Sequence, residues 1–402
     1  MAAKNSNLSK AKTAKNDEFY TQYHDIEKEM QAYLDFNPDV FKDKTILLPC
    51  DDPEWSNFTK YFAQNFQRLG LKKLISTSFA ATSKPAGFAY QPSLFEQSDE
   101  RFDLELSPKQ GKIFTLTHDK SGDGKINIDD LEWKYLKGDG DFRSDEVKKL
   151  RDQADIIITN PPFSLFREFL AWIVEADKKF TIISNKNAIT YKEVFPLIQS
   201  NKIWSGAMSM GADILFHIPK EMENEFIENK QEGSAYRKVG NELMARTTGM
   251  WLTNLDHGRR HEPLPLMTMA DNLKFNKKIV GTAAYLKYDN YNAIEVPFTN
   301  AIPSDFDGIM GVPISFLDKY NPDQFEILGA TQRGCHDLVP DTKKYDDYWE
   351  MKQNGEKTGS KGGKTNENAN LAMNDGKKNY FINQDGHSVQ SAYQRIFIKH
   401  KQ

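Results

Sequence analysis

Apolar and polar positions along the first part of the chain follow a repeated strand–helix–strand order. Short apolar runs, which predict buried strands, lie at residues 45–49, 73–76, 155–159 and 180–184. Apolar residues spaced by three or four positions, which predict helices, lie at residues 19–33, 56–69 and 165–173. This repetition predicts an α/β fold with a mostly parallel sheet that helices cover on both faces. Ligands bind such sheets beyond the carboxyl ends of the strands, so the residues that follow each run are the first candidates for a site.

The regular alternation stops after Leu255, and Pro263 and Pro265 then interrupt the chain. Residues 351–370 carry many glycines, asparagines and lysines and almost no apolar side chain, which predicts a long loop. The first fifteen residues hold four lysines and no acidic side chain, which is typical of a disordered arm or of an arm that contacts phosphate groups. We therefore divide the chain into an arm at 1–15, a domain at 16–264 and a C-terminal region at 265–402.

Charge and composition narrow the class of protein. The 402 residues include 53 lysines and arginines against 57 aspartates and glutamates, a net charge of −4, so any binding of a polyanion depends on local patches. No apolar run approaches the ~20 residues that span a bilayer, and the lysine-bearing N-terminus lacks the apolar core of a secretory signal. Cys50 and Cys335 are too few for a disulfide framework and fit a reducing compartment. We expect a cytoplasmic protein without a membrane partner.

The most informative motif is Asn160-Pro161-Pro162-Phe163, directly after the apolar run at 155–159. Two prolines remove two backbone donors and keep the chain extended, so the Asn160 side chain and the Pro161 carbonyl are predicted to point off the strand end. Both oxygens can accept hydrogen bonds from an exocyclic amine, and Phe163 offers a flat face to a ring. Accepting those protons keeps the nitrogen lone pair out of the ring and makes the amine a better nucleophile. A plain proline turn is the alternative.

This tetrapeptide after a strand resembles the motif of the DNA methyltransferases that methylate adenine N6 or cytosine N4. Longer segments resemble, in order, the EcoRI-type adenine-specific DNA methyltransferases: KNDEFYTQY, LLPCDDPEWSNFTKYF, GDGDFRSDEV, NPPFSLFREFL, NKNAITYKEVFPLI, WLTNLDHGRR, YDNYNAIEV and MGVPISFLDKYNPDQFEILG. The resemblance covers most of the chain. It implies a Rossmann-like, S-adenosylmethionine-dependent catalytic domain at 16–264 and a DNA target-recognition region at 265–402. It also implies catalytic roles for Asn160, Pro161, Pro162 and Phe163.

The resemblance implies a cofactor site made from several separated segments. Its residues are Phe19, Tyr20, Thr21, Pro49, Cys50, Asp51, Asp52, Ser76, Asp141, Phe142 and Asn160. Most such enzymes have a glycine-rich loop after the first strand, whereas this sequence has two aspartates. Either Asp51 or Asp52 is expected to neutralise the amino group of the cofactor. Alternatively, one of them merely caps the helix that begins near Pro53.

The same resemblance assigns other residues to parts of the cofactor. Residues 19–21 match an element that lies over the methionine part, with a plain helix start as the alternative. Asp141 and Phe142 match a pair that binds the adenine amine and stacks on its ring. Asp139 competes with Asp141, and a solvated glycine-rich turn is the alternative to both. Since no acidic residue follows the second strand to hold the ribose, hydroxyl contacts from Ser76 are the substitute.

Methyl transfer to a base in duplex DNA requires the base to leave the helix, at a cost of a few kcal/mol. Stacking on Phe163 would return about 1–3 kcal/mol, and Trp251 is a candidate second wall unless it packs in the core. The candidate DNA-binding residues are Lys12, Lys15, Trp251, His257, Arg259 and Arg260. Arginine can bind guanine through two hydrogen bonds, whereas a solvated charge run is the alternative. The lysines at 352–378 suit phosphate contact and a plain surface loop equally.

Residues 119–130 approximate a calcium-binding loop, with oxygen-bearing side chains at several ligand positions and Gly124 at the sixth. The third position is only Ser121, and the last is Asp130 where such loops have glutamate. The β character of residues 113–117 favours the turn of a hairpin instead. We therefore expect no metal here.

The expected function is transfer of a methyl group from S-adenosylmethionine to the N6 amine of a flipped-out adenine in double-stranded DNA. Cytosine-N4 methylation is the alternative. An RNA or protein amine methyltransferase is a further one, although those usually have Tyr in place of Phe163. A chain that binds DNA without catalysis is the last. We expect a monomer or weak dimer, associated with the nucleoid when on DNA, and a cognate restriction endonuclease that shares the site as a further partner.

Overall fold

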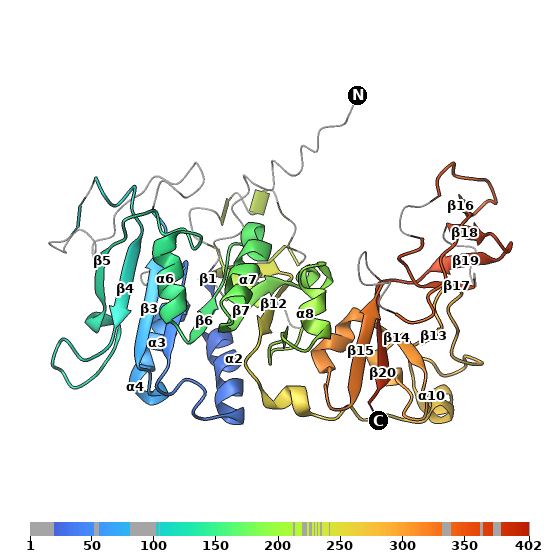
Figure 1. Ribbon diagram of the computed structural model, residues 1–402, viewed down its shortest axis with the longest axis horizontal. Helices are drawn as coiled ribbons and strands as arrows, with labels where there is room; N and C mark the ends of the chain where they lie inside the picture. Colours follow the sequence, from blue (N-terminus) through green and yellow to red (C-terminus); the bar gives the residue numbers. More distant parts are fainter. Residues whose placement is uncertain are drawn as a thin grey trace. The chain divides into compact units, whose positions relative to one another are not determined.

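The computed structural model divides into two compact units, which Figure 1 shows in sequence colours. The first unit comprises Met1–Lys186 and Ser205–Gly258, and the second comprises Asn187–Trp204 and Arg259–Gln402. The structure describes residues 20–51, 56–80, 102–103, 105–211, 214–218, 223–224, 227–228, 230, 232–233, 235–240, 242–331, 339–361, 365–372 and 379–401.

An eight-stranded sheet forms the centre of the first unit, with the order β5-β4-β3-β2-β6-β7-β12-β8. Its strands are β2 (Thr45–Leu48), β3 (Lys73–Ser78), β4 (Lys112–Leu116), β5 (Glu132–Tyr135), β6 (Ile156–Thr159), β7 (Lys179–Asn185), β8 (Trp204–Ser205) and β12 (Gly249–Thr253). β3, β2, β6 and β7 are parallel neighbours, whereas β4, β5 and β12 pair antiparallel. The four predicted strands are therefore the parallel centre of a mixed sheet.

Burial on both faces explains why the central strands read as continuous apolar runs. Every residue of β2 and β6 is buried. The helices of this unit with both ends in the described part of the chain are α2 (Tyr23–Phe36), α3 (Asn57–Gln64), α4 (Phe66–Leu69), α6 (Asp145–Gln153) and α7 (Phe166–Glu175), with short 3₁₀ turns η3 (Ile128–Asp130) and η4 (Phe163–Leu165). One core cluster joins Ile46 and Leu48 of β2 to Met30 of α2 and Phe62 of α3. The predicted α/β architecture is confirmed for this unit.

The connections leave β2 and β6 in opposite directions across the sheet. β2 is followed by β3 on one side, and β6 is followed by β7 on the other. The carboxyl ends of β2 and β6 therefore form the topological switch point, where open α/β sheets bind their ligands. Both predicted key segments, 49–52 and 160–163, follow these two strands directly.

A smaller sheet of the first unit has the order β1-β9-β11-β10. Its strands are β1 (Tyr20–Thr21), β9 (Ile214–His217), β10 (Tyr236–Val239) and β11 (Glu242–Thr247). β1 pairs antiparallel with β9, with Thr21 opposite Phe216. The helix predicted from residue 19 therefore begins later, at Tyr23.

Two four-stranded sheets make up most of the second unit. The first, in the order β13-β14-β20-β15, contains β13 (Ala293–Glu295), β14 (Ile309–Pro313), β15 (Phe325–Ala330) and β20 (Arg395–His400). The second, in the order β16-β18-β19-β17, contains β16 (Tyr348–Met351), β17 (Asn370–Ala372), β18 (Tyr380–Asn383) and β19 (Ser388–Ser391). The other elements are η5 (Lys186–Thr190), α8 (Phe195–Gln199), η6 (Gly258–His261), α10 (Met269–Phe275), η7 (Thr299–Ala301) and η8 (Ile314–Lys319).

The second unit begins earlier than the expected boundary at Pro263–Pro265, and it takes Asn187–Trp204 from within the predicted first domain. Nε2 of Gln199 donates to the carbonyl oxygen of Leu328 at 2.8 Å, so α8 packs with the C-terminal strands. The spacing of apolar residues predicts helices and strands but not which domain they join, so it could not show that residues 187–204 belong to the second unit. Among the described residues, none of the helices combines the length and apolarity that crossing a bilayer requires.

Candidate active site

The carboxylate of Asp51 is the centre of the polar contacts at the switch point. It follows β2, is 6% exposed, and accepts hydrogen bonds from Ser56 Oγ at 2.7 Å and Thr159 Oγ1 at 2.6 Å. Ser56 caps α3, since its Oγ accepts from the backbone N–H of Phe58 at 3.1 Å. Asp51 therefore joins the carboxyl ends of β2 and β6, and the cap of the following helix is Ser56.

Cys50 turns the chain at the end of β2. Its φ of +76° lies in the left-handed region that favours glycine. Its N–H donates to Thr77 Oγ1 at 3.4 Å, and the carbonyl of the preceding Pro49 accepts from Thr159 Oγ1 at 2.7 Å. The turn is thus bonded to the ends of both neighbouring strands, which holds the segment at the switch point.

Ser76 lies inside this network and not on its surface. The side chain is fully buried, its Oγ lies 3.1 Å from Thr59 Oγ1, and it also donates to the backbone carbonyl of Asp51. This location corrects the expectation that Ser76 contacts the ribose, because its hydroxyl is used to fix the backbone of the β2 turn.

The glycine-rich loop at 138–142 lies directly against the end of β3. A Cβ atom on Gly140, whose φ is +89°, would lie 2.4 Å from the Ser78 carbonyl oxygen. The N–H of Ala80 donates to the carbonyl of Asp139 at 2.8 Å. Only glycine permits this close approach of two backbones, so the loop is held at the carboxyl edge of the sheet.

Asp141 belongs to the same edge. Nε of Arg143 donates to its Oδ1 at 2.9 Å, and this bond holds the pKa of the Asp141 carboxyl below its usual value. Burial raises the pKa of the Cys50 thiol well above its usual value, and the charges of Asp51 and Asp141 raise it further. The charges of Asp51 and Asp141 therefore both act on the Cys50 thiol, which stays protonated at neutral pH.

Phe142 has a different environment from Asp141. Its ring is 1% exposed and packs edge-on against Phe169 at 5.0 Å and Trp172 at 5.7 Å between centroids. This corrects the expectation that Phe142 stacks on a cofactor ring, because the ring is a core side chain that anchors the loop.

β6 brings the Asn160–Phe163 motif to the same edge as Asp51. Asn160 comes directly after Thr159, whose hydroxyl bonds both the Asp51 carboxylate and the Pro49 carbonyl. Pro161 is buried, while Asn160 and Phe163 are half-buried. The motif continues into η4, where the N–H of Leu165 donates to the Pro162 carbonyl at 3.0 Å. The predicted catalytic motif and the predicted cofactor residues at 49–51 are therefore neighbours in space.

The N-terminal element reaches the site through its backbone. Nδ2 of Asn57, the first residue of α3, donates to the carbonyl of Thr21 at 2.8 Å, and Thr21 is 3% exposed. Of Tyr20 the structure describes only the strand pairing. The predicted residues that lie outside the described part of the chain are Lys12, Lys15, Phe19 and Asp52.

Trp251 and His257 are buried and not on the surface. Trp251 is 1% exposed in the main core cluster, with Phe58 at 5.9 Å, as the core-packing alternative predicts. His257 is 3% exposed, its Nε2 lies 3.0 Å from the Ser205 carbonyl, and its ring meets Tyr33 edge-on. These positions correct the expectation that both residues contact DNA.

The predicted basic patch is largely engaged in contacts within the second unit. Arg259 pairs with Asp318 at 2.7 Å, and the guanidinium of Arg260 lies 3.7 Å from the Trp204 ring centroid. Lys361 pairs with Asp347 at 2.8 Å. Lys352 similarly pairs with Glu356, whereas Lys364, Lys377 and Lys378 lie outside the described residues. The described lysines of the 352–378 segment therefore fit the plain surface loop.

The segment at 119–130 is the connection of a β-hairpin, as predicted, because β4 and β5 pair antiparallel. Oδ2 of Asp119 accepts from the N–H of Gly124 at 2.7 Å, and Oδ1 accepts from Gly122 at 2.6 Å. These backbone donors, Gly124 first, hold the pKa of Asp119 below its usual value. The carboxylate thus organises the turn itself. In the described part of the chain, no group of three or more His, Cys, Asp or Glu side chains is placed to hold a metal ion.

Two important polar residues were not predicted from the sequence. Thr159 ends an apolar run, and its only signal is its position immediately before Asn160. Glu29 is fully buried on α2 and accepts from Tyr33 Oη at 2.6 Å and from the N–H groups of Ala207 and Met208 at 2.8 Å each. A glutamate within a helix normally faces water, so periodicity alone does not reveal this anchor.

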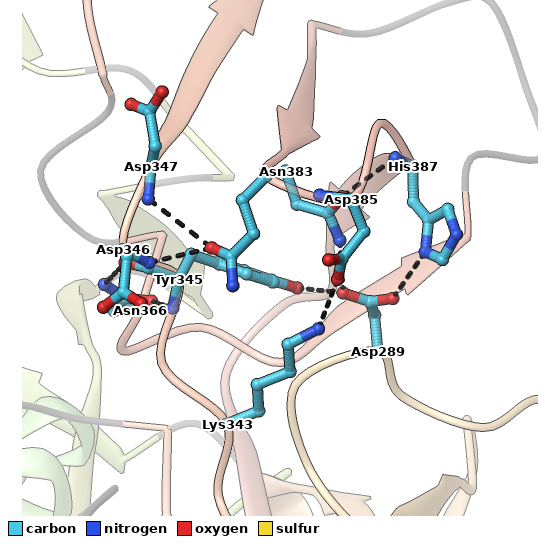
Figure 2. Close-up of polar contacts among 10 residues, drawn as sticks. Asp289, Lys343, Tyr345, Asp346, Asp347, Asn366, Asn383, Asp385 and His387 are labelled. Carbon is cyan, nitrogen blue, oxygen red and sulfur yellow. Dashed lines mark hydrogen bonds and ion pairs between the residues drawn. The ribbon is translucent and has the colours of Figure 1, made fainter.

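The second unit has its own polar cluster around Asp289, which Figure 2 shows. Its carboxylate accepts from Tyr345 Oη at 2.6 Å and from Asn383 Nδ2 at 3.0 Å, and it lies 3.5 Å from Nδ1 of His387. Burial raises the pKa of Tyr345, and the neighbouring Asp289 raises it further. The cluster connects the segment before β13 to the turn after β18, which is a structural role.

Comparisons with known proteins identify the family of the chain. The family model for the adenine-specific methyltransferase EcoRI matches residues 7–401. The chain is 44% identical over 328 residues to the Type II methyltransferase M.EcoRI of Escherichia coli, covering 81% of this chain and 89% of that protein. It is 32% identical over 324 residues to the Type II methyltransferase M.MpnI of Mycoplasma pneumoniae, covering 80% and 84%. No solved structure matches. The chain therefore belongs to the EcoRI family of adenine-specific methyltransferases.

Proposed function

We propose that this chain transfers the methyl group of S-adenosylmethionine to the N6 amine of an adenine that is flipped out of duplex DNA. Family membership and the three relatives named Type II methyltransferases support site-specific DNA as the substrate. The observation that carries the proposal is the direct succession of Thr159, bonded to Asp51, and Asn160. It brings an amine-binding motif and a buried carboxylate to one edge of the sheet.

The residues around the β2 turn suit a cofactor that carries positive charge. Asp51 supplies a buried carboxylate, and the Pro49 carbonyl and the Asp141 carboxylate add oxygen atoms at the same edge. Oxygen acceptors of this kind stabilise an ammonium or a sulfonium group in a partly dehydrated site. When bound, S-adenosylmethionine supplies an electrophilic methyl group. We assign Thr21, Pro49, Cys50, Asp51 and Asp141 to its site.

The role of Asn160 and Pro161 is to orient the amine. Their oxygens accept the two amine protons, which directs the nitrogen lone pair out of the ring plane and toward the methyl group. The half-buried ring of Phe163 stacks on the adenine, which returns about 1–3 kcal/mol toward the cost of extruding it. The second unit is the proposed DNA target-recognition region.

Asn160→Ala tests this assignment. The variant should lose methyl transfer by about 10²- to 10³-fold or more, because an aligned acceptor is removed from the reacting amine. Duplex binding should stay within a few-fold of the unmodified chain. The matched control is Asn292→Ala, an exposed asparagine of the second unit, which should keep full activity. Equal activity of Asn160→Ala and the unmodified chain would refute the role.

The base and its sequence context can be obtained in one experiment. The chain is expressed in cells that lack adenine methylation, and modified bases are mapped by long-read sequencing. N6-methyladenine at one recurrent sequence supports the proposal. N4-methylcytosine, or no modified base from a folded protein, contradicts it.

A further inference from the structure

The second unit presents an exposed apolar and basic surface around the end of α10. Four large apolar side chains in this part of the chain are well exposed: Phe275 (60%), Val280 (55%), Leu286 (47%) and Phe298 (39%). Lys274, Lys277 and Lys278 are exposed between them. We name this group of residues, Lys274, Phe275, Lys277, Lys278 and Phe298, the Lys–Phe surface. An exposed apolar patch with charged neighbours marks an interaction site.

The Lys–Phe surface is preformed. Nδ2 of the buried Asn276 donates to the carbonyl of Asn300 at 2.8 Å, and its Oδ1 accepts from the N–H of Lys278 at 3.1 Å. Nζ of Lys278 lies 5.2 Å from the centroid of the Phe298 ring, and Nζ of Lys274 lies 4.8 Å from that of Phe275. Asn276 thus fixes the backbone of the lysine turn next to the segment that carries Phe298.

The surface carries a local excess of positive charge. Residues 271–289 hold four lysines and two acidic residues, Asp271 and Asp289, which lie at the two ends of this stretch. Across the described residues, Lys274, Lys277 and Lys278 form no ion pair, whereas Arg259 and Lys361 each pair with an aspartate. This excess of positive charge favours a partner that supplies negative charge.

We propose that the Lys–Phe surface contacts the sugar–phosphate backbone of duplex DNA. This inference rests on the proposed function and assigns part of its DNA interface. Ammonium groups bind phosphates by releasing counterions, and exposed aromatic rings next to them can pack against the sugars. Two copies of the chain joined through this surface by a two-fold axis would bring its like charges together, which disfavours self-association as its purpose.

The test compares two triple variants of the full chain. Lys274→Gln/Lys277→Gln/Lys278→Gln removes the charge of the Lys–Phe surface. Lys125→Gln/Lys134→Gln/Lys137→Gln, in and beside the β4–β5 hairpin, removes three other exposed charges as the matched control. Binding to a mixed-sequence duplex is measured over a series of salt concentrations. The slope of log K against log salt should fall in magnitude by about 2.7 in the first variant, at about 0.9 per lost phosphate contact, and by less than about 0.9 in the control.

An unchanged slope in the first variant, or an equal fall in both variants, overturns the inference. Unchanged thermal unfolding shows that both variants fold. Methyl transfer by the unmodified chain separates the two proposals: if it neither binds nor methylates duplex DNA, the proposed function fails. If it does both and the slope is insensitive to the Lys–Phe surface, only this inference fails.

Phe275→Ser/Phe298→Ser gives a second measurement. It should weaken duplex binding about tenfold at constant salt while leaving the salt slope unchanged, because it removes apolar contact with the sugars and no charge. The opposite result would be that the unmodified chain is a dimer, that the double variant is a monomer, and that both bind duplex DNA equally well. That result would make the surface a contact between copies and would overturn the inference.

Discussion

The two units bury different kinds of polar side chain. Among the described residues, the buried asparagines are Asn272, Asn276, Asn290, Asn321, Asn370 and Asn383, and all belong to the second unit. Buried serines and threonines are concentrated in the first unit, where Ser56, Thr59, Ser76, Thr77 and Thr159 surround the switch point. The difference shows how each unit satisfies its backbone.

Hydroxyl and amide side chains form different sets of hydrogen bonds with the backbone. In the first unit the strands pair their own N–H and C=O groups, and short hydroxyl side chains such as Ser56 and Thr159 link the cap of α3 and the end of β6 to Asp51. In the second unit irregular chain runs between short strands, and an asparagine can donate to one backbone carbonyl while accepting from one N–H. Asn290 does this with Asn368 and Asn370.

Gly140→Ala should have the largest effect on the strand-end architecture of the first unit. The new Cβ would lie 2.4 Å from the Ser78 carbonyl oxygen at a φ of +89°, so strain and a backbone clash add to about 3 kcal/mol or more of lost stability. Gly122→Ala is the control, since Gly122 also has positive φ but has open space around its Cβ. It should cost about 1–2 kcal/mol. Urea denaturation that gives equal losses would show that the close approach to β3 is unimportant.

Asn290→Ala should have the next largest effect, and it tests the second unit. The substitution leaves the Asn368 carbonyl and the Asn370 N–H without their partner in a buried site, which should cost about 2–3 kcal/mol. The loss should appear in the unfolding of the second unit alone, followed by aromatic fluorescence and hydrogen exchange. The exposed Asn292→Ala is the control. A loss shared by both units would mean that they do not unfold separately.

Thr159→Val should cost about as much stability as Asn290→Ala, and it should also have a specific effect on the cofactor. It removes the hydroxyl that donates to Asp51, a hydrogen bond to a charged group worth about 1.5–3 kcal/mol. We expect the KM for S-adenosylmethionine to rise about tenfold. Thr181→Val removes a buried hydroxyl of β7 that bonds Thr253 at 2.7 Å, away from the strand ends. Comparable KM values for the two variants would reduce Thr159 to a packing residue.

Much of the first unit was predictable because its central strands are buried on both faces. The apolar runs predicted β2, β3, β6 and β7, and parallel order then brought the segments after β2 and β6 together. Phe142 and Trp251 were harder, because a motif or an aromatic residue carries no information on whether its ring faces a ligand or the core. Ser76 likewise has the same sequence signature whether its hydroxyl bonds a ribose or a neighbouring turn.

The second unit was largely unpredictable because it is held together by buried asparagines and short strands. A buried Asn276 or Asn370 looks like a loop residue in the sequence, and strands of three or four residues have too few positions to show alternation. Arg259 forms an ion pair with Asp318, which is far from it in the chain. The local sequence around Arg259 therefore could not show that its charge is neutralised within the protein.

The two-segment composition of the second unit has a consequence for protein engineering. Ile189 and Phe195, from the early segment, line one small cavity with Leu317 and Ile396 from the late segment. A fragment cut after Gly258 would retain α8 without its apolar neighbours, and the excised C-terminal piece would lack it. Exchanging the second unit between relatives therefore needs three junctions, after Lys186, Trp204 and Gly258, and not a single crossover point.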